Sequence, residues 1–387
     1  RLSYALHEQD PDYRPPPGFR PDLIRRLDRP VRRFAVGQQG EMLEFAAPET
    51  PPSGSHLADC TSRNGLIQIK LLPTDPDRNA FWRFGQPPPW ADDWGTDDYG
   101  HWVTFSVENR QGYKVTQRMR WIEPGTFFMG SPKDEPERFK NEDPQHLVTI
   151  RQGFWLFDTA CTQALWEAVM GENPSWYKGA DHPVERVDWN DCQSFLNRLN
   201  KRRPGLDLVL PSEAQWEYAC RAGTTTPFSF GATITPEQAN YDGNFPYAGG
   251  KKGLNRRKTV PVASLPPNLW GLYEMHGNVW EWCQDRRHDN YRGAPADGSA
   301  WEDHDAVAGR VLRGGSWDHY ARSVRSASRD ANRPGLRHDD VGFRCVRVRS
   351  DAEPTTKPEQ SQPGGATGAQ PTLLRLDASP SPVRCAL

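Results

Sequence analysis

Hydrophobic and polar residues alternate with a period of two in short stretches of the first third of the chain. Residues 66–71 and 101–107 place apolar side chains at every second position, and Pro, Gly and Asp residues surround them. Successive side chains of a strand point to opposite faces of a sheet, so this pattern predicts β-strands. We therefore expect a small β-rich region over residues 32–112, of a type that the pattern does not name.

Further along the chain, two segments carry the start and stop signals of helices. Residues 162–170 have helical spacing and end before Gly171. A second helix is expected to begin at Ser212, which forms a capping box with Gln215. Gly223 then supplies its C-terminal stop, because glycine adopts the left-handed conformation found after many helices.

A third helix is expected to begin near Asn190 or Asp191 and to bury Phe195 and Leu199. Both Asn and Asp are good N-caps. The triplet that starts with Trp189 also resembles the Trp-Asn-Asp triplet of sugar-binding lectins. Capping is the preferred interpretation, because the chain has no Glu-Pro-Asn motif to complete a sugar site.

The two ends of the chain differ in amino-acid composition from its centre. Residues 1–31 are basic and proline-rich, which is typical of a linker. Residues 351–387 are rich in Pro, Gly, Ser and Gln, and such a segment buries too little apolar surface to offset the entropy of ordering. We expect a disordered tail there, and one further domain over residues 113–350.

Composition excludes some classes of function. The formal net charge is -2 and the mean hydropathy is -0.82, and no apolar run approaches the ~20 residues that span a bilayer. We expect neither membrane insertion nor binding of nucleic acid by the chain as a whole. The 36 Pro and 33 Gly favour a loop-rich fold. The 15 Trp are expected mostly in the core, since each can bury ~200 Å².

The seven cysteines do not form the framework of a disulfide-rich protein. Their number is odd and their spacing is irregular. The sequence contains no Cys-x-x-Cys pair, which would have suggested a structural zinc site. This usage favours a reducing compartment, and the expected location is the cytoplasm.

Five short motifs appear in a fixed order in the second half of the chain. They are PGTFFMGS at 124–131, LPSEAQWEYACRAG at 210–223, GLYEMHGNVWEW at 271–282, RGGSW at 313–317 and GFRC at 342–345. Together they resemble the formylglycine-generating enzyme (sulfatase-modifying factor) family. The resemblance implies an α+β, loop-rich C-type-lectin-like fold of that subtype, with two helices and a surface that presents ligands.

The resemblance does not extend to the family's catalytic residues. The family's oxidase chemistry uses two cysteine thiolates, which are soft ligands suited to Cu(I), just after the Gly-Gly-Ser-Trp stretch. In this chain His319 stands at the first cysteine position, the second falls in a shortened stretch, and the next cysteine is Cys345. We therefore expect neither copper nor oxidase activity. The alternative is a formylglycine-generating or related metal-dependent oxidase. A non-haem iron site would need a cluster of His and carboxylate residues, and the spacing along the chain suggests none.

The segment 314–344 also resembles the variable region of proteins diversified by retroelements. Those elements mutate adenines, and Asn codons changed in this way do not yield Glu, Lys, Gln, Met or Trp. Residues 318–342 contain none of these five. The alternative is a non-catalytic relative whose polar surface loop was never diversified. One feature differs from that group. Its variable regions usually lie at the C-terminal end of the chain, whereas here residues 351–387 follow the segment.

We expect the diversified segment to be a ligand-binding surface at about residues 318–340. The positions assigned as variable are Asp318, His319, Tyr320, Ser323, Ser328, Asp330, Asn332, Leu336, His338, Asp339 and Asp340. Tyr320 and Leu336 would supply apolar contacts and the others polar selectivity, a division like that of antibody loops. The expected partner is an unknown protein or surface ligand, bound by a monomer.

The arginines of the same region have a structural interpretation. Residues 309–349 contain ten Arg against four Asp, a balance that could also indicate nucleic acid. We favour ion pairs with acidic neighbours. The arginines assigned to the fixed framework are Arg322, Arg325, Arg329, Arg333 and Arg337.

The resemblance also implies one structural calcium ion. The matching ligands are the side chains of Glu274 and Glu281 and the carbonyl groups of Gly277 and Val279. Carboxylate and carbonyl oxygens suit Ca²⁺. The family has an amide at the position of Glu274, so its extra charge would either tighten calcium binding or pair with an arginine.

Overall fold

The fold is described from a computed structural model, which divides the chain into two compact units. It describes residues 88–303 and 309–347 in full, and four strands before them as backbone. These are β1 (Arg32–Val36), β2 (Met42–Ala46), β3 (His56–Arg63) and β4 (Leu66–Leu71). They form an antiparallel sheet in the order β2-β1-β3-β4, in line with the β-rich pattern of this region. The expectations for residues 1–31 and 351–387 lie outside the described residues.

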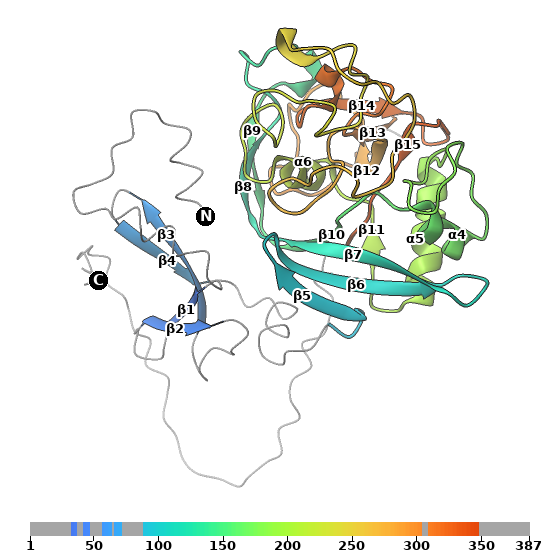
Figure 1. The fold of residues 1–387 in the computed structure, drawn as a ribbon. Helices are drawn as coiled ribbons and strands as arrows, with labels where there is room; N and C mark the ends of the chain where they lie inside the picture. Colours follow the sequence, from blue (N-terminus) through green and yellow to red (C-terminus); the bar gives the residue numbers. More distant parts are fainter. Residues whose placement is uncertain are drawn as a thin grey trace. The chain divides into compact units, whose positions relative to one another are not determined.

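The second unit, residues 89–357, is built on a six-stranded sheet (Figure 1). Its strands, in spatial order, are β11 (Leu208–Val209), β16 (Val346–Arg347), β10 (Phe154–Phe157), β7 (Lys114–Ile122), β6 (Gly100–Glu108) and β5 (Asp93–Asp97). The late strand β16 inserts between β10 and β11, so the start and the end of the domain share one sheet.

The domain boundary expected at residue 112 is wrong. Strand β6 was expected in the small N-terminal region, but it pairs with β7 along seven residue pairs, from Trp102–Arg120 to Glu108–Lys114. The physical reason is the alternating burial of β6, where Val103, Phe105 and Val107 are buried within the main domain. Alternation alone predicts a strand, but it does not say which sheet the strand joins.

A second layer lies above this sheet in Figure 1 and contains the resemblance motifs. It consists of a four-stranded sheet, β14-β13-β12-β15, and the separate hairpin β8-β9. The strands are β8 (Gly125–Met129), β9 (His146–Ile150), β12 (Trp280–Arg286), β13 (Arg310–Arg313), β14 (Arg329–Asn332) and β15 (Val341–Gly342). Long irregular segments connect these short strands, as the Pro and Gly content predicts.

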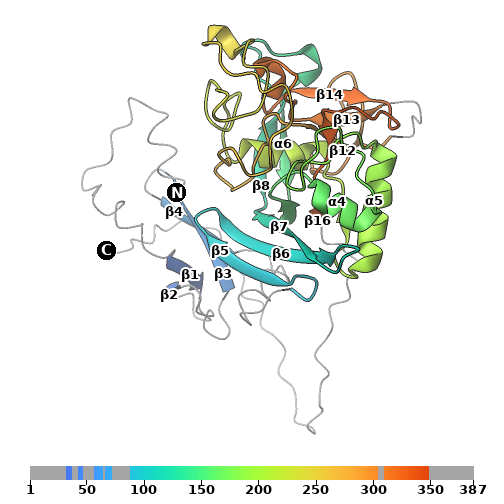
Figure 2. The same ribbon diagram turned by 45° about the vertical axis from the view of Figure 1, so that its right-hand side comes forward.

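Three α-helices lie in the fully described part of the chain. They are α4 (Gln163–Met170), α5 (Trp189–Arg202) and α6 (Glu213–Arg221). Figure 2 shows α4 and α5 side by side, and α4 contacts β6 and β7. Helix α6 lies between the β8-β9 hairpin and the β12-β13 strands. No helix among the described residues is both long enough and apolar enough to cross a membrane.

The helix caps confirm two expectations and correct a third. Ser212 caps α6 in a capping box with Gln215, and α4 ends at Gly171, which has a positive φ of 90°. The N-cap of α5 is Asp188 rather than Asn190 or Asp191. Asp191 instead completes the capping box by accepting from the backbone N–H of Asp188. The N-cap therefore lies two residues before Asn190 and three before Asp191.

The core of the second unit is aromatic. Seven of the tryptophans described are buried: Trp90, Trp155, Trp166, Trp216, Trp280, Trp282 and Trp317. Trp216 of α6 is fully buried and donates a hydrogen bond from its Nε1 to Glu281. The expectation that tryptophan fills the core of a loop-rich fold therefore holds for these residues.

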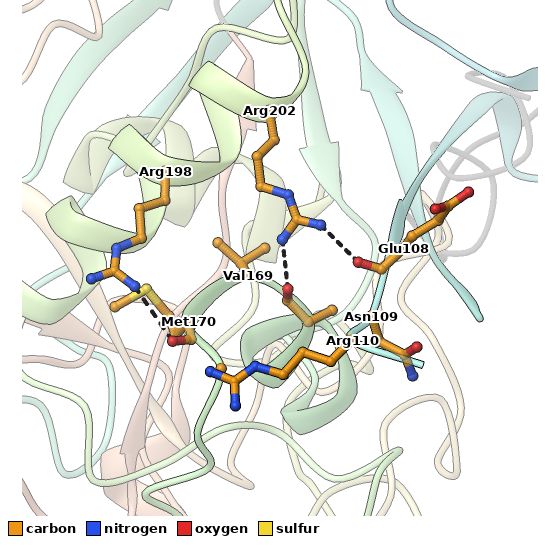
Figure 3. Close-up of a pocket in the computed structure, with 9 residues that line it drawn as sticks. Glu108, Asn109, Arg110, Val169, Met170, Arg198 and Arg202 are labelled. Carbon is orange, nitrogen blue, oxygen red and sulfur yellow. Dashed lines mark hydrogen bonds between the residues drawn. The ribbon is translucent and has the colours of Figure 1, made fainter. Parts of the chain in front are cut away.

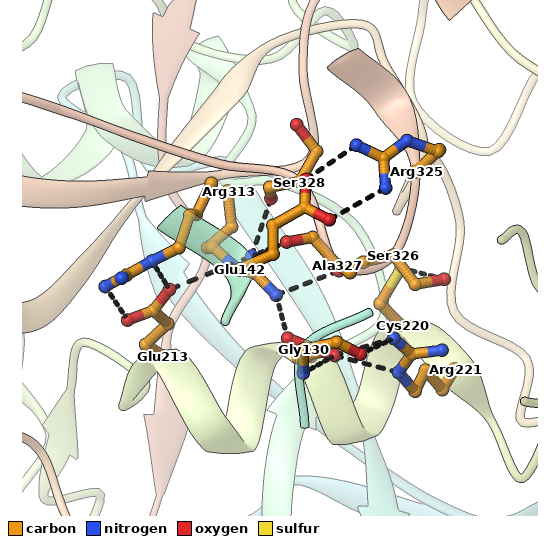
Figure 4. A network of polar contacts seen from close by, with 12 residues as sticks. Gly130, Glu142, Glu213, Cys220, Arg221, Arg313, Arg325, Ser326, Ala327 and Ser328 are labelled. Atoms are coloured by element: carbon orange, nitrogen blue, oxygen red, sulfur yellow. Dashed lines mark hydrogen bonds and ion pairs between the residues drawn. The ribbon is translucent and has the colours of Figure 1, made fainter. Parts of the chain in front are cut away.

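Buried arginine–glutamate pairs connect β13, β14 and the segment between them to α6 and to the loop after β8 (Figure 4), and one further pair connects the segment after β15 to β12. The pairs are Arg313–Glu217, Arg325–Glu135, Arg325–Glu142, Arg329–Glu213 and Arg344–Glu281, with distances of 2.5 to 2.7 Å. Burial raises the pKa of Glu135. Burial would also raise the pKa of Glu142, but hydrogen bonds from Arg325 outweigh it and lower that pKa. Both carboxylates therefore depend on this one guanidinium.

Arg325 is expected to contribute strongly to stability. Its side chain is fully buried between Glu135 and Glu142. Removing one partner of a buried ion pair leaves an uncompensated charge, so Arg325→Ala should lower the free energy of unfolding by about 3 kcal/mol or more. Chemical denaturation measures this change. Arg333→Ala is the matched control, because Arg333 is exposed and its loss should cost less than about 0.5 kcal/mol. Equal stability of the two variants would contradict the role assigned to the network.

Candidate functional site

The segment expected to display variable side chains divides into exposed flanks and a buried middle. Asp318, Tyr320, Asp330 and His338 are exposed, and five more of the assigned positions are half-buried. These five are His319, Ser323, Asn332, Leu336 and Asp339. Residues 324–329 are buried throughout. The candidate surface therefore comprises residues 318–323 and 330–339 rather than one continuous loop.

Two of the assigned positions do not lie at the surface. Ser328 is 1% exposed and lies just before β14, where its carbonyl accepts a hydrogen bond from the guanidinium of Arg313. Asp340 is 3% exposed and accepts from the hydroxyl of Ser316 at 2.7 Å. The codon argument that selected these positions carries no information about burial, and the expectation that both are displayed is wrong.

The two flanks meet at a group of acidic and imidazole side chains, here termed the His-Asp cluster: Asp318, His319, His338, Asp339 and Asp340. The Nδ1 of His338 lies 2.5 Å from Oδ1 of Asp340 and 3.3 Å from Oδ1 of Asp339. The other oxygen of Asp340 lies 3.5 Å from Nδ1 of His319. Residues about twenty positions apart in sequence are thereby brought to one place.

The backbone around the cluster is held from several directions. The carbonyl of His338 accepts from the N–H of Arg186 at 2.9 Å, and that of Asp340 accepts from the N–H of Trp280 at 2.8 Å. The indole of Trp317 donates to the carbonyl of Asp339 at 3.3 Å. The Oγ of Ser316, in the Arg-Gly-Gly-Ser-Trp motif, contacts both His319 and Asp340. The cluster is therefore positioned by the scaffold motifs.

Like charges are concentrated at the cluster. Burial raises the pKa of Asp318, and the negative charges of Asp340, Asp339 and Asp242 raise it further. Burial alone would lower the pKa of His338, but its hydrogen bond to Asp340 outweighs burial and raises that pKa. This part of the surface therefore has a negative potential.

Acidic groups also perturb the side chains beneath the cluster. Burial raises the pKa of Tyr177, and the charges of Asp339, Glu185 and Asp318 add to the effect. Burial raises the pKa of Glu185 to about 7. The Oε2 of Glu185 is buried and has no hydrogen-bond partner among the described residues.

Exposed aromatic side chains from three different segments of the chain lie near the cluster. Tyr320, 47% exposed, stacks on Phe245 with ring centroids 3.9 Å apart. Trp176 is 63% exposed and lies against the guanidinium of Arg186, whose N–H donates to His338. Aromatic and polar groups in this arrangement can supply both contact area and selectivity. Of these residues the sequence analysis selected only Tyr320, and exposed aromatics offer no periodic signal by which to find the others.

The remaining assigned positions lie on another part of the domain. Asp330 and Asn332 belong to β14, and Leu336 lies in the loop that follows. This loop contacts the start of α5, because the carbonyl of Pro334 accepts from the N–H of Trp189. These positions form a second, separate part of the candidate surface.

Three of the five framework arginines form the expected ion pairs. Arg325 and Arg329 are buried against glutamates, and Arg337 pairs with Asp188 and Asp191 at the start of α5. The other two framework arginines do not form such a pair. Arg322 lies over the Phe139 ring at 4.1 Å, and Arg333 is exposed. The expectation of ion pairs with acidic neighbours is thus confirmed for the three paired arginines.

The residues assigned to calcium are occupied by other partners. Both oxygens of Glu281 accept from Arg344, at 2.6 and 2.8 Å. The oxygens of Glu274 accept from the N–H groups of Ala263 and Leu265. The carbonyl of Gly277 accepts from the N–H of Val279. This arrangement does not fit a calcium ion, because the positive charge beside Glu281 is already supplied by Arg344.

One further hollow lies beside α4 and α5, away from the assigned residues (Figure 3). It has a volume of about 300 Å³ and is lined by Arg110, Arg198 and Arg202 among others. Arg198 donates to the carbonyl of Met170, and Arg202 to that of Ala168. These arginines satisfy the carbonyl groups at the C-terminus of α4, which is a structural role.

The cysteines of the fully described residues are buried free thiols: Cys161, Cys192, Cys220, Cys283 and Cys345. Burial raises the pKa of Cys220 to about 12, and it raises the pKa of Cys345 above its ordinary value. Since a thiolate rather than a thiol binds copper, none of these positions offers the pair of exposed thiolates that the oxidase chemistry requires.

The fold and these motifs define a loop-rich domain of the formylglycine-generating-enzyme-like, C-type-lectin class. Residues 104–349 match the sulfatase-modifying factor enzyme 1-like domain, and the chain belongs to this family. It is 33% identical over 240 residues to the formylglycine-generating enzyme of Streptomyces coelicolor, which covers 57% of this chain and 72% of that enzyme. It spans only 50 to 61% of the length of three other such enzymes that it matches.

Two solved structures are similar. PvdO from Pseudomonas aeruginosa has a TM-score of 0.52 and 29% identity, covering 66% of this chain and 98% of that one. Treponema denticola variable protein 1 has a TM-score of 0.50 and 27% identity, covering 63% and 98%. The resemblance stated from the sequence motifs is therefore confirmed.

Glu274→Gln should change how stability depends on pH. Burial raises the pKa of Glu274 to about 7, above its value of 4.5 in an unfolded chain. The folded protein therefore holds a proton that the unfolded chain has lost, and this contribution disappears as pH rises from 4.5 through 7. The glutamine variant should gain roughly 1–3 kcal/mol relative to the wild type between pH 5 and pH 8.

Melting curves of both proteins at pH 5 and pH 8, with calcium or with EDTA, measure this difference. We expect no calcium effect. A bound calcium ion at hundredfold excess over Kd would instead add about 2.7 kcal/mol to the wild type. A rise of that kind, absent in Glu281→Ala, would restore the calcium site.

Proposed function

We propose that this protein is a non-catalytic binding protein, whose scaffold presents the His-Asp cluster and its flanking aromatic residues to a protein or surface ligand. The observation that carries the proposal is the histidine at residue 319, where the family's copper chemistry needs a cysteine. Its Nδ1 contacts the hydroxyl of Ser316 at 2.7 Å and its neighbour Tyr320 is exposed. The position therefore contributes an imidazole to the proposed binding surface instead of a soft thiolate ligand for copper.

The physical character of this surface supports binding. Tyr320 and Phe245 form a stacked pair that is about half exposed. Rigid aromatic groups bury a large area at a low cost in conformational entropy. The acidic cluster beside them favours a partner with positive charge, because complementary charges speed encounter and exclude wrong partners.

The division of the segment supports diversification of its flanks. The buried residues 324–329 are fixed by the ion pairs of Arg325 and Arg329, whereas Asp318, Tyr320 and His338 are exposed. Treponema denticola variable protein 1, by its name a variable protein, is similar in fold. We propose that the same division of a fixed framework and changeable surface residues applies here, in a monomer located in the cytoplasm.

The alternative function is formylglycine generation, favoured by the similarity to the Streptomyces coelicolor enzyme. We expect this protein to leave the cysteine of a sulfatase-type peptide unchanged in the presence of Cu(I) and oxygen. Mass spectrometry of the peptide measures the conversion, with that enzyme as the positive control and copper alone as the blank. Conversion above the blank would overturn the non-catalytic proposal.

Diversification makes a separate prediction about the gene. A reverse transcriptase and a near-copy of the segment coding for residues 314–344 should lie beside it. The copies should differ at exposed positions such as Asp318, Tyr320 and His338, and should agree at the buried Ser328 and Asp340, where changes would disturb packing. Sequencing of the locus in related strains tests this. Differences spread evenly over residues 318–340 would contradict the division described above.

A further inference from the structure

The geometry points to a binding site for a divalent transition-metal ion, best suited to Zn²⁺, formed by His338, Asp339 and Asp340. Each of the three residues offers one ligand atom, and these atoms all lie within 4.8 Å of one another. The donor set is one imidazole nitrogen and two carboxylate oxygens. The inference does not rest on the proposed binding function, because it requires only these contacts.

The distances are close to those of a metal site. Ligand atoms at ~2.0 Å from a tetrahedral zinc ion lie about 3.3 Å apart. The Nδ1 of His338 lies 3.3 Å from the nearer oxygen of Asp339 and 2.5 Å from that of Asp340. A bound ion would take the position between these three atoms after a side-chain movement of less than about 1 Å at the closer pair.

The chemistry of the donors favours a transition metal over calcium or magnesium. Zinc is bound in proteins by histidine nitrogen and by Asp or Glu oxygen, and imidazole also suits iron, nickel and copper. Calcium takes six to eight ligands, all of them oxygen. The half-exposed His338 therefore determines the class of ion.

The site is held in place before any ion binds. The carbonyl of His338 accepts from the backbone of Arg186, and Asp340 is followed by β15, which pairs with β12 in the core sheet. The second oxygen of Asp340 accepts from Ser316. Outer partners of this kind orient metal ligands and strengthen binding.

Among the fully described residues, the carboxylates of the site form no ion pair with a lysine or an arginine. Within the fully described ranges, the ion-pair partners of Asp339 and Asp340 are histidines. Asp191, by contrast, pairs with Arg337. The charges of Asp339, Asp340 and Asp242 also act on Asp318. A divalent cation would neutralise this group of carboxylates.

The site opens to solvent, which leaves room for a further ligand. The side chain of His338 is 56% exposed and that of Asp339 is 31% exposed, whereas Asp340 is buried at its base. Three protein ligands and an open position are typical of zinc sites that bind water or an exogenous group. The ion could thus bridge the protein to a carboxylate or imidazole of a partner.

Isothermal titration of the full chain with Zn²⁺, after removal of metals with a chelator, tests the site. We expect one ion per chain, and His338→Ala should weaken binding by about tenfold or more. His288→Ala is the matched control, because Nε2 of His288 contacts Asp303 at 2.6 Å in a comparable pair that forms no three-ligand group within the described residues. The control should bind as the wild type does.

Co²⁺ supplies a second readout, since its visible absorption reports the ligands around it. The spectrum should change in Asp339→Asn, a conservative variant of a half-exposed residue, while circular dichroism shows that the fold is kept. Equal Zn²⁺ affinity in the wild type and His338→Ala would overturn the site, and so would displacement of Zn²⁺ by Ca²⁺ at similar concentration. A variant that loses zinc but keeps its protein partner would overturn only the bridging role of the ion, and leave the proposed binding function intact.

Discussion

Buried charge pairs are the constraint on which the rest of this structure depends. The domain has short strands joined by long irregular segments, so regular backbone hydrogen bonding fixes only part of it. Arg325 joins a late segment to Glu135 and Glu142, which lie almost two hundred residues earlier in the chain. An ion removed from water without its partner costs several kcal/mol. Alternative arrangements of the loops would separate these pairs, and the cost of doing so selects one arrangement.

The same network explains how a rigid scaffold and a changeable surface are formed by one segment. Between residues 318 and 340, the arginines at 325 and 329 point inward to glutamates, while Asp318, Tyr320 and His338 remain at the surface. Stability is thus supplied by residues that no ligand touches. The side chains that would contact a ligand make few contacts with the core, so their chemistry is free of the demands of folding.

The sequence predicted those elements whose signals are local. The capping box at Ser212 and the glycine after α4 specify helix ends within a few residues, and both were found. Features that depend on distant contacts were missed or misplaced. Strand β6 was assigned to the wrong region because its partner β7 could not be identified from alternation. The five residues of the His-Asp cluster were selected, but their proximity was not predicted, because it arises only when residues 316–319 meet residues 338–340. Glu281 was assigned to calcium, since nothing local to it indicates Arg344, sixty-three positions later.

The guanidinium of Arg313 binds the main-chain carbonyl groups of Ser326, Ala327 and Ser328. Every residue has a backbone carbonyl group, so these hydrogen bonds fix the path of the chain at residues 326–328 independently of the side chains there. The flanking loops start and finish at fixed coordinates whatever residues they contain. For protein engineering, the exposed positions of the two flanks, such as Asp318, Tyr320, Asp330 and His338, could then be randomised in libraries without redesigning the frame that holds them.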